Sequence, residues 1–267
     1  KPSFELVRVI EIAGRQGVAT DGEAYFASSS TSLFRYSKTG QLLAENAKAL
    51  SDLPLKANHI GDISVHEGEL YAAIEFFEDG RGQDIQIAVY DARTLTYLRS
   101  MPWAPESGQV EVSAIAVDAS QDAIWLTDWV SGHYVYRYGL SSGRYRGKLH
   151  LRAPPQWQQG IAVFDGDLYI TADDGDAEYG EVDNLWRVPA DRESTAAYVA
   201  HAHAFREFPR AGEIEGLCFD AAANEMIVLS NRGKRIVLGM PKGLYPGYDR
   251  EIHELHVYRI RGTQPKH

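Results

Sequence analysis

The chain has 267 residues, of which 37 are acidic and 27 are basic, so its formal net charge at pH 7 is −10. This negative balance argues against general electrostatic binding to nucleic acid or to an anionic membrane surface. No apolar run is long enough to span a bilayer, and a hydrophobic content of 44% suits one packed domain, which we expect to be a monomer.

One sequence pattern recurs five times along the chain, at intervals of about fifty residues. Each copy contains a small residue, an apolar pair, a turn region, a strand with Tyr, Trp or another large apolar residue, and a further aromatic strand that usually contains Arg. The copies place the blades at 14–50, 58–103, 111–152, 158–203 and 213–262. A period of this length built from short strands is typical of a β-propeller. The sequence therefore predicts one all-β domain over residues 1–267, a five-bladed β-propeller of four-stranded blades.

The first copy shows how the strands of a blade follow one another. Val18-Ala19 and Ala24-Tyr25-Phe26 flank a turn at Asp21-Gly22, and Leu33-Phe34-Arg35-Tyr36 forms the next strand. Fourth strands are expected at the end of the first four copies, at 41–45, 97–101, 145–151 and 197–201.

The fifth copy has no sequence left for a fourth strand, because only a polar tail follows Ile260. Residues 4–12 precede the first copy and begin with alternating polar and apolar residues, as a strand with one buried face does. We predict that this segment is the outer strand of blade 5 and pairs with 256–260, which closes the ring and covers a sheet edge.

In a propeller, the starts of the first strands and the ends of the second strands meet at one mouth of the central channel, and this chain carries polar residues at those points. Crowded carboxyl groups and a histidine suit acid–base chemistry; the catalytic candidates are His59, Glu111, Glu213 and Glu215. The ligand-binding candidates at the mouth are Arg15, Gln16, Gln159, Trp129, Asn231 and Arg232.

The same mouth could hold a metal ion, because carboxylate and amide oxygens suit Ca²⁺ better than Zn²⁺. The metal-ligand candidates are Asp62, Asp128, Asp173, Asp174 and Glu215. A solvated surface that binds nothing is the other interpretation.

The longest insertion, 231–250, follows the second strand of the fifth copy and is rich in Gly, Pro, Tyr and basic residues. Its position predicts a flap over the mouth, or alternatively a hairpin that only packs on a neighbouring blade. As a flap, it would hold an anionic or sugar-like small molecule, with Arg232 and Arg235 binding the charge and Tyr245 and Tyr248 stacking.

Three functions fit this pattern, since the fold alone does not select among them. The first is a small-ligand-binding propeller whose acidic mouth holds a calcium ion. The second is a hydrolase, lyase or cyclotransferase that uses Glu and His groups at the same mouth. The third is a protein-interaction scaffold. No Gly-x-Ser-x-Gly elbow and no phosphate-binding glycine loop occurs, so those enzyme classes lack support.

The single cysteine, Cys218, excludes an internal disulfide and lies in an apolar strand, where it is expected to be a small buried side chain. The sequence opens at Lys1 without an initiator Met, from which we expect a removed leader and a periplasmic or secreted location.

The start Arg15-Gln16-Gly17-Val18, with Tyr25 and a later Thr39-Gly40 turn, is similar to the first blade of the propeller-type glutaminyl cyclotransferases. The resemblance covers one blade and implies cyclisation by a glutamate in the following strand. Residues 25–31 contain no acidic residue, so this chain departs from the family pattern there. The chain also resembles uncharacterised bacterial five-bladed propellers, which implies the fold and no activity.

Overall fold

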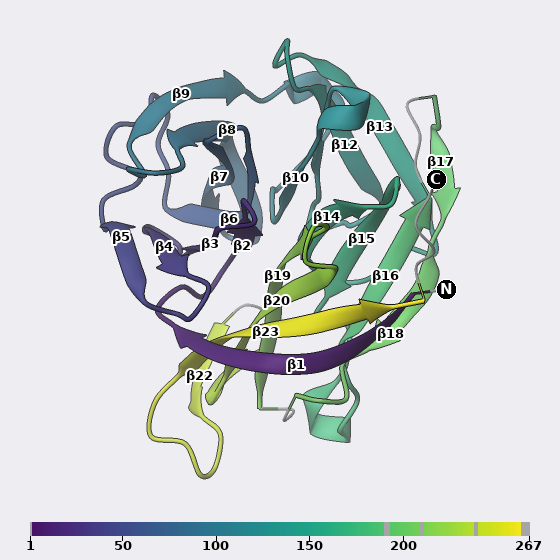
Figure 1. Ribbon diagram of the computed structural model, residues 1–267. Helices are drawn as coiled ribbons and strands as arrows, with labels where there is room; N and C mark the ends of the chain where they lie inside the picture. Colours follow the sequence, from purple (N-terminus) through teal and green to yellow (C-terminus); the bar gives the residue numbers. More distant parts are fainter. Residues whose placement is uncertain (1, 190–192, 209–210, 238–239, 263–267) are drawn as a thin grey trace.

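The computed structural model describes residues 2–189, 193–208, 211–237 and 240–262, and these form an all-β, five-bladed propeller (Figure 1). The fold predicted from the repeat is therefore confirmed. The helical segments of the described residues are three single turns of 3₁₀ helix: η1 (Pro105–Ser107), η2 (Ala119–Gln121) and η3 (Ala177–Tyr179). None of the helices in the described part is both long enough and apolar enough to cross a membrane.

The first three blades follow one another along the chain and around the axis (Figure 1). Blade 1 contains β2 (Val18–Thr20), β3 (Ala24–Ser28), β4 (Leu33–Ser37) and β5 (Leu42–Asn46). Blade 2 contains β6 (His59–His66), β7 (Glu69–Glu78), β8 (Arg81–Asp91) and β9 (Tyr97–Pro102). Blade 3 contains β10 (Ile115–Asp118), β11 (Ala123–Leu126), β12 (Tyr134–Gly139), β13 (Tyr145–Arg152) and β17 (Ala196–Tyr198).

The last two blades complete the ring. Blade 4 contains β14 (Gln158–Phe164), β15 (Asp167–Ala172), β16 (Asn184–Pro189) and β18 (Ala200–Ala204). Blade 5 contains β19 (Gly212–Asp220), β20 (Glu225–Arg232), β23 (Ile252–Arg261) and β1 (Ser3–Ile12). A separate hairpin of β21 (Lys234–Val237) and β22 (Met240–Leu244) lies between β20 and β23 in the sequence.

One predicted strand, 197–201, is divided between two blades. Strand β17 pairs in parallel with β13, so that Leu151 lies opposite Ala197, and adds a fifth strand to blade 3. The chain then crosses over, and β18 completes blade 4 by antiparallel pairing with β16. The prediction of a single fourth strand at 197–201 was therefore wrong, because the outer edge of β13 offers unpaired backbone groups that the chain meets first.

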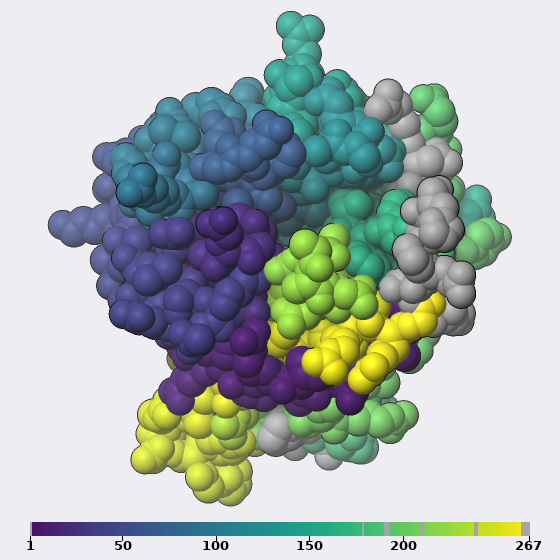
Figure 2. Space-filling model, in the orientation of Figure 1, coloured from purple at the N-terminus to yellow at the C-terminus, as the bar shows by residue number. Residues whose placement is uncertain are grey.

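The predicted closure of the ring by the N-terminal strand is confirmed. Strand β1 pairs antiparallel with β23, with Phe4 opposite Ile260 and Ile10 opposite Leu255. Figure 2 shows the purple N-terminal strand beside the yellow C-terminal strand along the rim. The ends of the chain are therefore held in one sheet, and an edge of β23 that would otherwise be exposed is covered.

The core consists of five apolar clusters in the described residues, one for each pair of adjacent blades. Phe26 of blade 1, for example, packs with Ile60 and Leu70 of blade 2, and all three are fully buried. The cluster between blades 5 and 1 joins Tyr25 to Leu229, which closes the circle of contacts. Each blade is therefore held by apolar packing on both faces.

The inner strands come so close at the axis that only glycine fits at some positions. A Cβ atom added to Gly216 would lie 2.7 Å from the Cα atom of Gly17, and one added to Gly17 would lie 2.6 Å from the Cα atom of Asp62. These distances are too short for real carbon contacts, so the small residue in the repeat is required by the approach of the blades.

A buried carboxylate, Asp62, joins the inner strands of four blades at this narrow point. One of its oxygens accepts hydrogen bonds from the N–H groups of Val18 and Ile63, both at 2.9 Å. The other accepts from the N–H groups of Leu217, at 3.1 Å, and Ile161, at 3.3 Å. Asp62 therefore satisfies backbone groups of blades 1, 2, 4 and 5, and it is 1% exposed.

Candidate functional site

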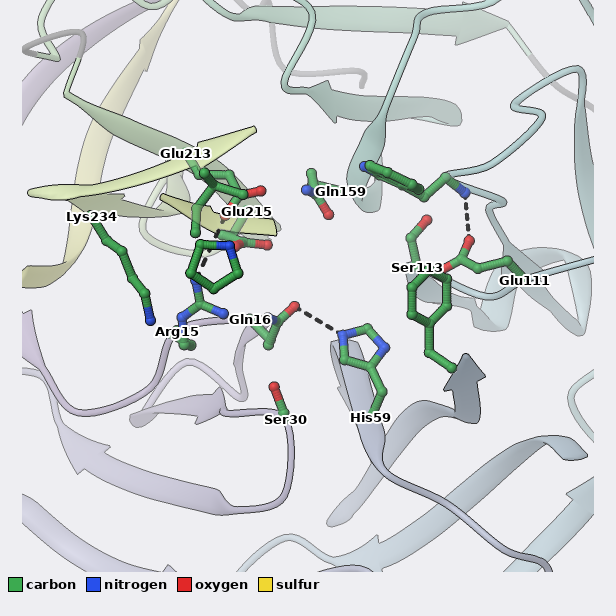
Figure 3. A pocket seen from close by; sticks show the side chains of 14 residues that line it. Arg15, Gln16, Ser30, His59, Glu111, Ser113, Gln159, Glu213, Glu215 and Lys234 are labelled. Atoms are coloured by element: carbon green, nitrogen blue, oxygen red, sulfur yellow. Dashed lines mark hydrogen bonds and ion pairs between the residues drawn. The ribbon is translucent and has the colours of Figure 1, made fainter. Parts of the chain in front are cut away.

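The mouth predicted from the sequence holds a cavity of about 240 Å³ (Figure 3). Eight of the predicted site residues line it: Arg15, Gln16, His59, Glu111, Trp129, Gln159, Glu213 and Glu215. They come from all five blades, because each blade contributes the start of an inner strand or the end of the next one. All four candidate catalytic residues are among them.

The cavity also has six lining residues outside the predicted set: Ser30, Phe77, Ser113, Lys234, Ile236 and Pro241. Phe77 was missed because β7 and β8 extend past the ring as a long hairpin, an extension that the repeat does not show. Lys234, Ile236 and Pro241 belong to the β21–β22 hairpin, within the insertion that was predicted to form a flap. The hairpin contributes an apolar wall with one ammonium group.

One buried carboxyl pair, Glu75 with Glu111, lies at the blade 2 side of the cavity. The two side chains share a hydrogen bond, and they are 0% and 2% exposed. Glu75 also accepts from the Val112 N–H at 2.9 Å and contacts His59 Nδ1 at 3.2 Å, while Glu111 accepts from the Trp129 N–H at 2.5 Å. Burial first, and then the charges of Glu75 and Asp128, raise the pKa of Glu111 well above its usual value. Glu111 is therefore set to hold a proton.

A second carboxyl pair, Glu213 with Glu215, lies across the cavity on the first strand of blade 5 (Figure 3). Burial raises the pKa of both groups, and the Arg15 guanidinium opposes this rise at each of them. The Asn231 amide donates to Glu215 at 2.9 Å, and its oxygen lies 2.7 Å from His253 Nδ1. Since the Asn231 oxygen only accepts, His253 donates this bond and fixes the amide that orients Glu215.

The cationic side chains of the cavity are already paired with carboxylates. Arg15 lies 3.7 Å from Glu213 and 3.1 Å from Glu251, and Lys234 Nζ lies 3.6 Å from Glu251. Burial lowers the pKa of Arg15, but Glu215, Glu251 and Glu213 outweigh this effect and leave it raised. His59 Nε2 is 3.3 Å from the Gln16 oxygen, which places Gln16 between the two carboxyl pairs. The carboxyl groups outnumber the cations around the cavity.

Two of the candidate metal ligands, Asp62 and Asp128, accept hydrogen bonds from backbone N–H groups at different places in the fold. Asp62 is engaged at the axis by four backbone groups, and the Asp128 carboxylate accepts from the N–H groups of Val130, at 2.9 Å, and Ser131, at 3.0 Å. The described residues contain no group of three or more His, Cys, Asp or Glu side chains arranged to hold a metal ion. Calcium binding stays a prediction.

Two other metal candidates, Asp173 and Asp174, line a second cavity next to the mouth. Asp174 accepts hydrogen bonds from the Asn184 amide at 2.9 Å and from the Trp186 indole at 2.7 Å. Burial raises its pKa, and these two donors lower it.

The residues predicted to clamp a ligand from the insertion fall in different places. Arg232 forms an ion pair with Glu254 at 2.7 Å and contacts the Tyr248 hydroxyl at 3.5 Å, so these two side chains pack on blade 5. Tyr245 lines the second cavity, and Arg235 lines neither cavity. Asn231 stands behind Glu215 and is 3% exposed, so it positions a lining residue. The hairpin therefore combines both interpretations of the insertion, since part of it packs and part of it lines the site.

Comparison with known proteins supports the fold. The structure is similar to the crystal structure of Myxococcus xanthus glutaminyl cyclase, with a TM-score of 0.63 and 12% sequence identity over 96% of each chain. It is also similar to the structure of U3-55K, with a TM-score of 0.54 and 10% identity over 95% of this chain and 100% of the other. No protein-family model matches the chain, and no curated protein matches its sequence. At these identities the likeness supports the β-propeller fold and nothing finer.

Proposed function

We propose that the mouth cavity binds a small ligand carrying an amine and an amide, and that the protein performs acid–base chemistry on it. The observation that supports this most strongly is the presence of three buried carboxyl groups in the wall of one cavity: Glu111, which is hydrogen-bonded to Glu75 behind it, and the neighbours Glu213 and Glu215. Titratable groups with pKa values raised by burial and by like charges are typical of catalytic sites.

The lining of the cavity favours an amine over an anion. Arg15 and Lys234 are paired with Glu213 and Glu251, and Glu111 and Glu215 supply carboxyl oxygens that can accept hydrogen bonds from an amine. Trp129, Phe77 and Ile236 add apolar surface that can cover the carbon chain of the ligand. The earlier expectation of an anionic or sugar-like ligand stays untested.

The two carboxyl pairs differ in the role for which their surroundings suit them. Glu111 faces the like charges of Glu75 and Asp128, so it keeps its proton and is suited to donate it. Glu213 lies beside Arg15, which favours the ionised form and suits it to accept a proton. An acid and a base are thereby placed on opposite sides of one cavity.

Cyclisation of an N-terminal glutaminyl residue requires such an arrangement. The α-amine attacks the side-chain amide carbon, a new C–N bond forms, and the old C–N bond breaks to release ammonia. Glu213 accepts the proton of the attacking amine, and Glu111 donates a proton to the leaving nitrogen. The similarity of the fold to a glutaminyl cyclase supports this as the first reaction to test, although the carboxyl groups here come from blades 2, 3 and 5.

The experiment is ammonia release from the dipeptide Gln-Ala, measured with the wild type and with Glu111→Gln and Glu213→Gln. We expect turnover by the wild type and a loss of about 10²- to 10⁴-fold in kcat for either variant, the usual contribution of a general acid or base. Glu45→Gln is the matched control, because Glu45 lies exposed on the outer strand β5. Absence of ammonia release by the folded wild type would overturn the proposed reaction.

Binding without chemistry is the second candidate, favoured by the apolar wall that Phe77, Ile236 and Pro241 supply. Calorimetric titration with the same dipeptide separates the two. Binding without ammonia release would support a ligand-binding propeller.

A further inference from the structure

A second cavity of about 450 Å³ opens beside the mouth and shares three of its lining residues, Trp129, Glu213 and Ile236. The two cavities thus have a common wall, and together they fall within the range of about 300–1,000 Å³ that is typical of small-ligand sites. A ligand that fills the mouth and is longer than one residue has to continue along the surface, and the second cavity is adjacent.

Besides the shared Trp129, two aromatic residues from different segments of the chain line this cavity. Trp157 comes from the segment before β14, and Tyr245 follows β22. The backbone of Trp157 has φ = +48°, a left-handed conformation that is unfavourable for a bulky residue. Its carbonyl accepts a hydrogen bond from the Asp173 N–H at 3.0 Å, which ties the Trp157 turn to the end of β15. The backbone that carries the indole is therefore constrained at this turn.

The charged residues that line the second cavity favour a cationic group. Asp173, Asp176 and Glu181 line it, and Glu213 lies in the wall shared with the mouth. No Lys or Arg is found among the described residues that line it. A Lys or Arg side chain placed here would meet carboxylates and aromatic faces together, and both stabilise a cation.

We propose that the second cavity is a subsite for the residue that follows the reacting one, and that it selects peptides with a basic side chain at that position. This inference rests on the proposed function of the mouth cavity and extends it from a single residue to a peptide. The substrate class is a short peptide whose first residue enters the mouth and whose second residue is Lys or Arg.

The test compares the tripeptide amides Gln-Lys-Gly, Gln-Ala-Gly and Gln-Glu-Gly by calorimetric titration, which needs no turnover. We expect the Lys peptide to bind about fivefold more tightly than the Ala peptide, the size of effect that one or two partly exposed ion pairs give. The Glu peptide should bind more weakly than both.

The double variant Asp176→Asn/Glu181→Gln should reduce the difference in affinity between the Lys and Ala peptides, because it removes two of the carboxylates that line the cavity and leaves Asp173 and Glu213. Both substitutions keep the shape of the side chain, and the amide oxygen at position 181 still accepts the bond from the Asp176 N–H at 3.1 Å. Glu23→Gln is the control, since Glu23 is exposed at the β2–β3 turn on the opposite face of the ring. It should leave the preference unchanged.

Ammonia release measured on the same samples separates the two proposals. A preference for the Lys peptide without ammonia release supports the proposed subsite and refutes the proposed reaction. Ammonia release together with equal affinity for all three peptides refutes the subsite and supports the reaction. A preference that is undiminished in the double variant also overturns the subsite, and failure of all three peptides to bind overturns both proposals.

Discussion

Replacement of Asp62 by alanine should destabilise the whole propeller. The change removes the acceptor of four backbone N–H groups, those of Val18, Ile63, Ile161 and Leu217, and leaves them in a buried position. These groups belong to the inner strands of four blades, so the effect is not confined to one sheet.

The magnitude follows from the number of groups left without a partner. A buried donor without an acceptor costs about 1–3 kcal/mol, so four of them give a loss of at least about 4 kcal/mol. This is a large part of the roughly 5–15 kcal/mol by which folded domains are stable. Asp62→Asn should lose about half as much, because its oxygen retains one pair of N–H donors while its NH₂ group faces the other pair.

Urea unfolding followed by tryptophan fluorescence measures both losses, and the control is Asp52→Ala, at an exposed position away from the axis. The order of stability should be wild type and Asp52→Ala, then Asp62→Asn, then Asp62→Ala. A loss below about 1 kcal/mol in Asp62→Ala would refute the reasoning, since that is the effect of a single ordinary hydrogen bond.

Three further predictions concern the closing strand, the buried carboxyl groups and the metal. Deletion of residues 1–12 removes β1 with the buried side chains of Phe4 and Ile12, which contribute about 1.5–3 kcal/mol each, and should lower Tm by roughly 10 °C or more in a thermal melt. The pKa of Glu215 is raised above its usual value of 4.5 in the folded state, so the free energy of unfolding should fall as the pH rises above 4.5. Glu215→Gln should reduce this dependence of the unfolding free energy on pH, measured by urea titrations at several pH values. An equal dependence in both proteins would contradict the raised pKa. The calcium prediction expects Tm to rise when Ca²⁺ is added after EDTA, and an unchanged Tm would mean that the backbone bonds of Asp62 and Asp128 leave no room for the ion.

The sequence was sufficient to predict the propeller because each part of the repeat has a local physical cause. Glycine at Gly17 and Gly216 marks the close approach of the inner strands, and the turns at Asp21-Gly22 and its equivalents mark the next change of direction. The N-terminal strand was predictable by elimination, since blade 5 lacked its fourth strand. The path at 197–201 was not predictable, because the choice between the edge of β13 and that of β16 depends on which edge lies nearer in space.

The candidate site was predictable in position and less so in role. Strand ends place Glu111, Glu213 and Glu215 at the mouth whatever their side chains contact. The structural role of Asp62 differs from that of Glu215 because different groups donate hydrogen bonds to the two side chains. These donors lie up to 155 residues away in the sequence, so the sequence does not reveal them. The Glu75 partnership with Glu111 was likewise invisible, since it joins the second strand of blade 2 to the entry of blade 3.

Asp62 and Glu215 represent two kinds of buried acid in this molecule. Asp62 meets four backbone donors that hold the blades together and lower its pKa, although burial outweighs them and leaves the pKa raised. Glu215 has the Asn231 amide and a second carboxyl group, Glu213, as neighbours, and it faces a cavity. Two carboxyl groups side by side destabilise a fold when both are ionised, and apolar residues of similar size would pack there at lower cost. The ring is closed by β1 and tied at the axis by Asp62, whereas Glu111, Glu213 and Glu215 line a cavity and have raised pKa values, which is why we propose the mouth as the acid–base site.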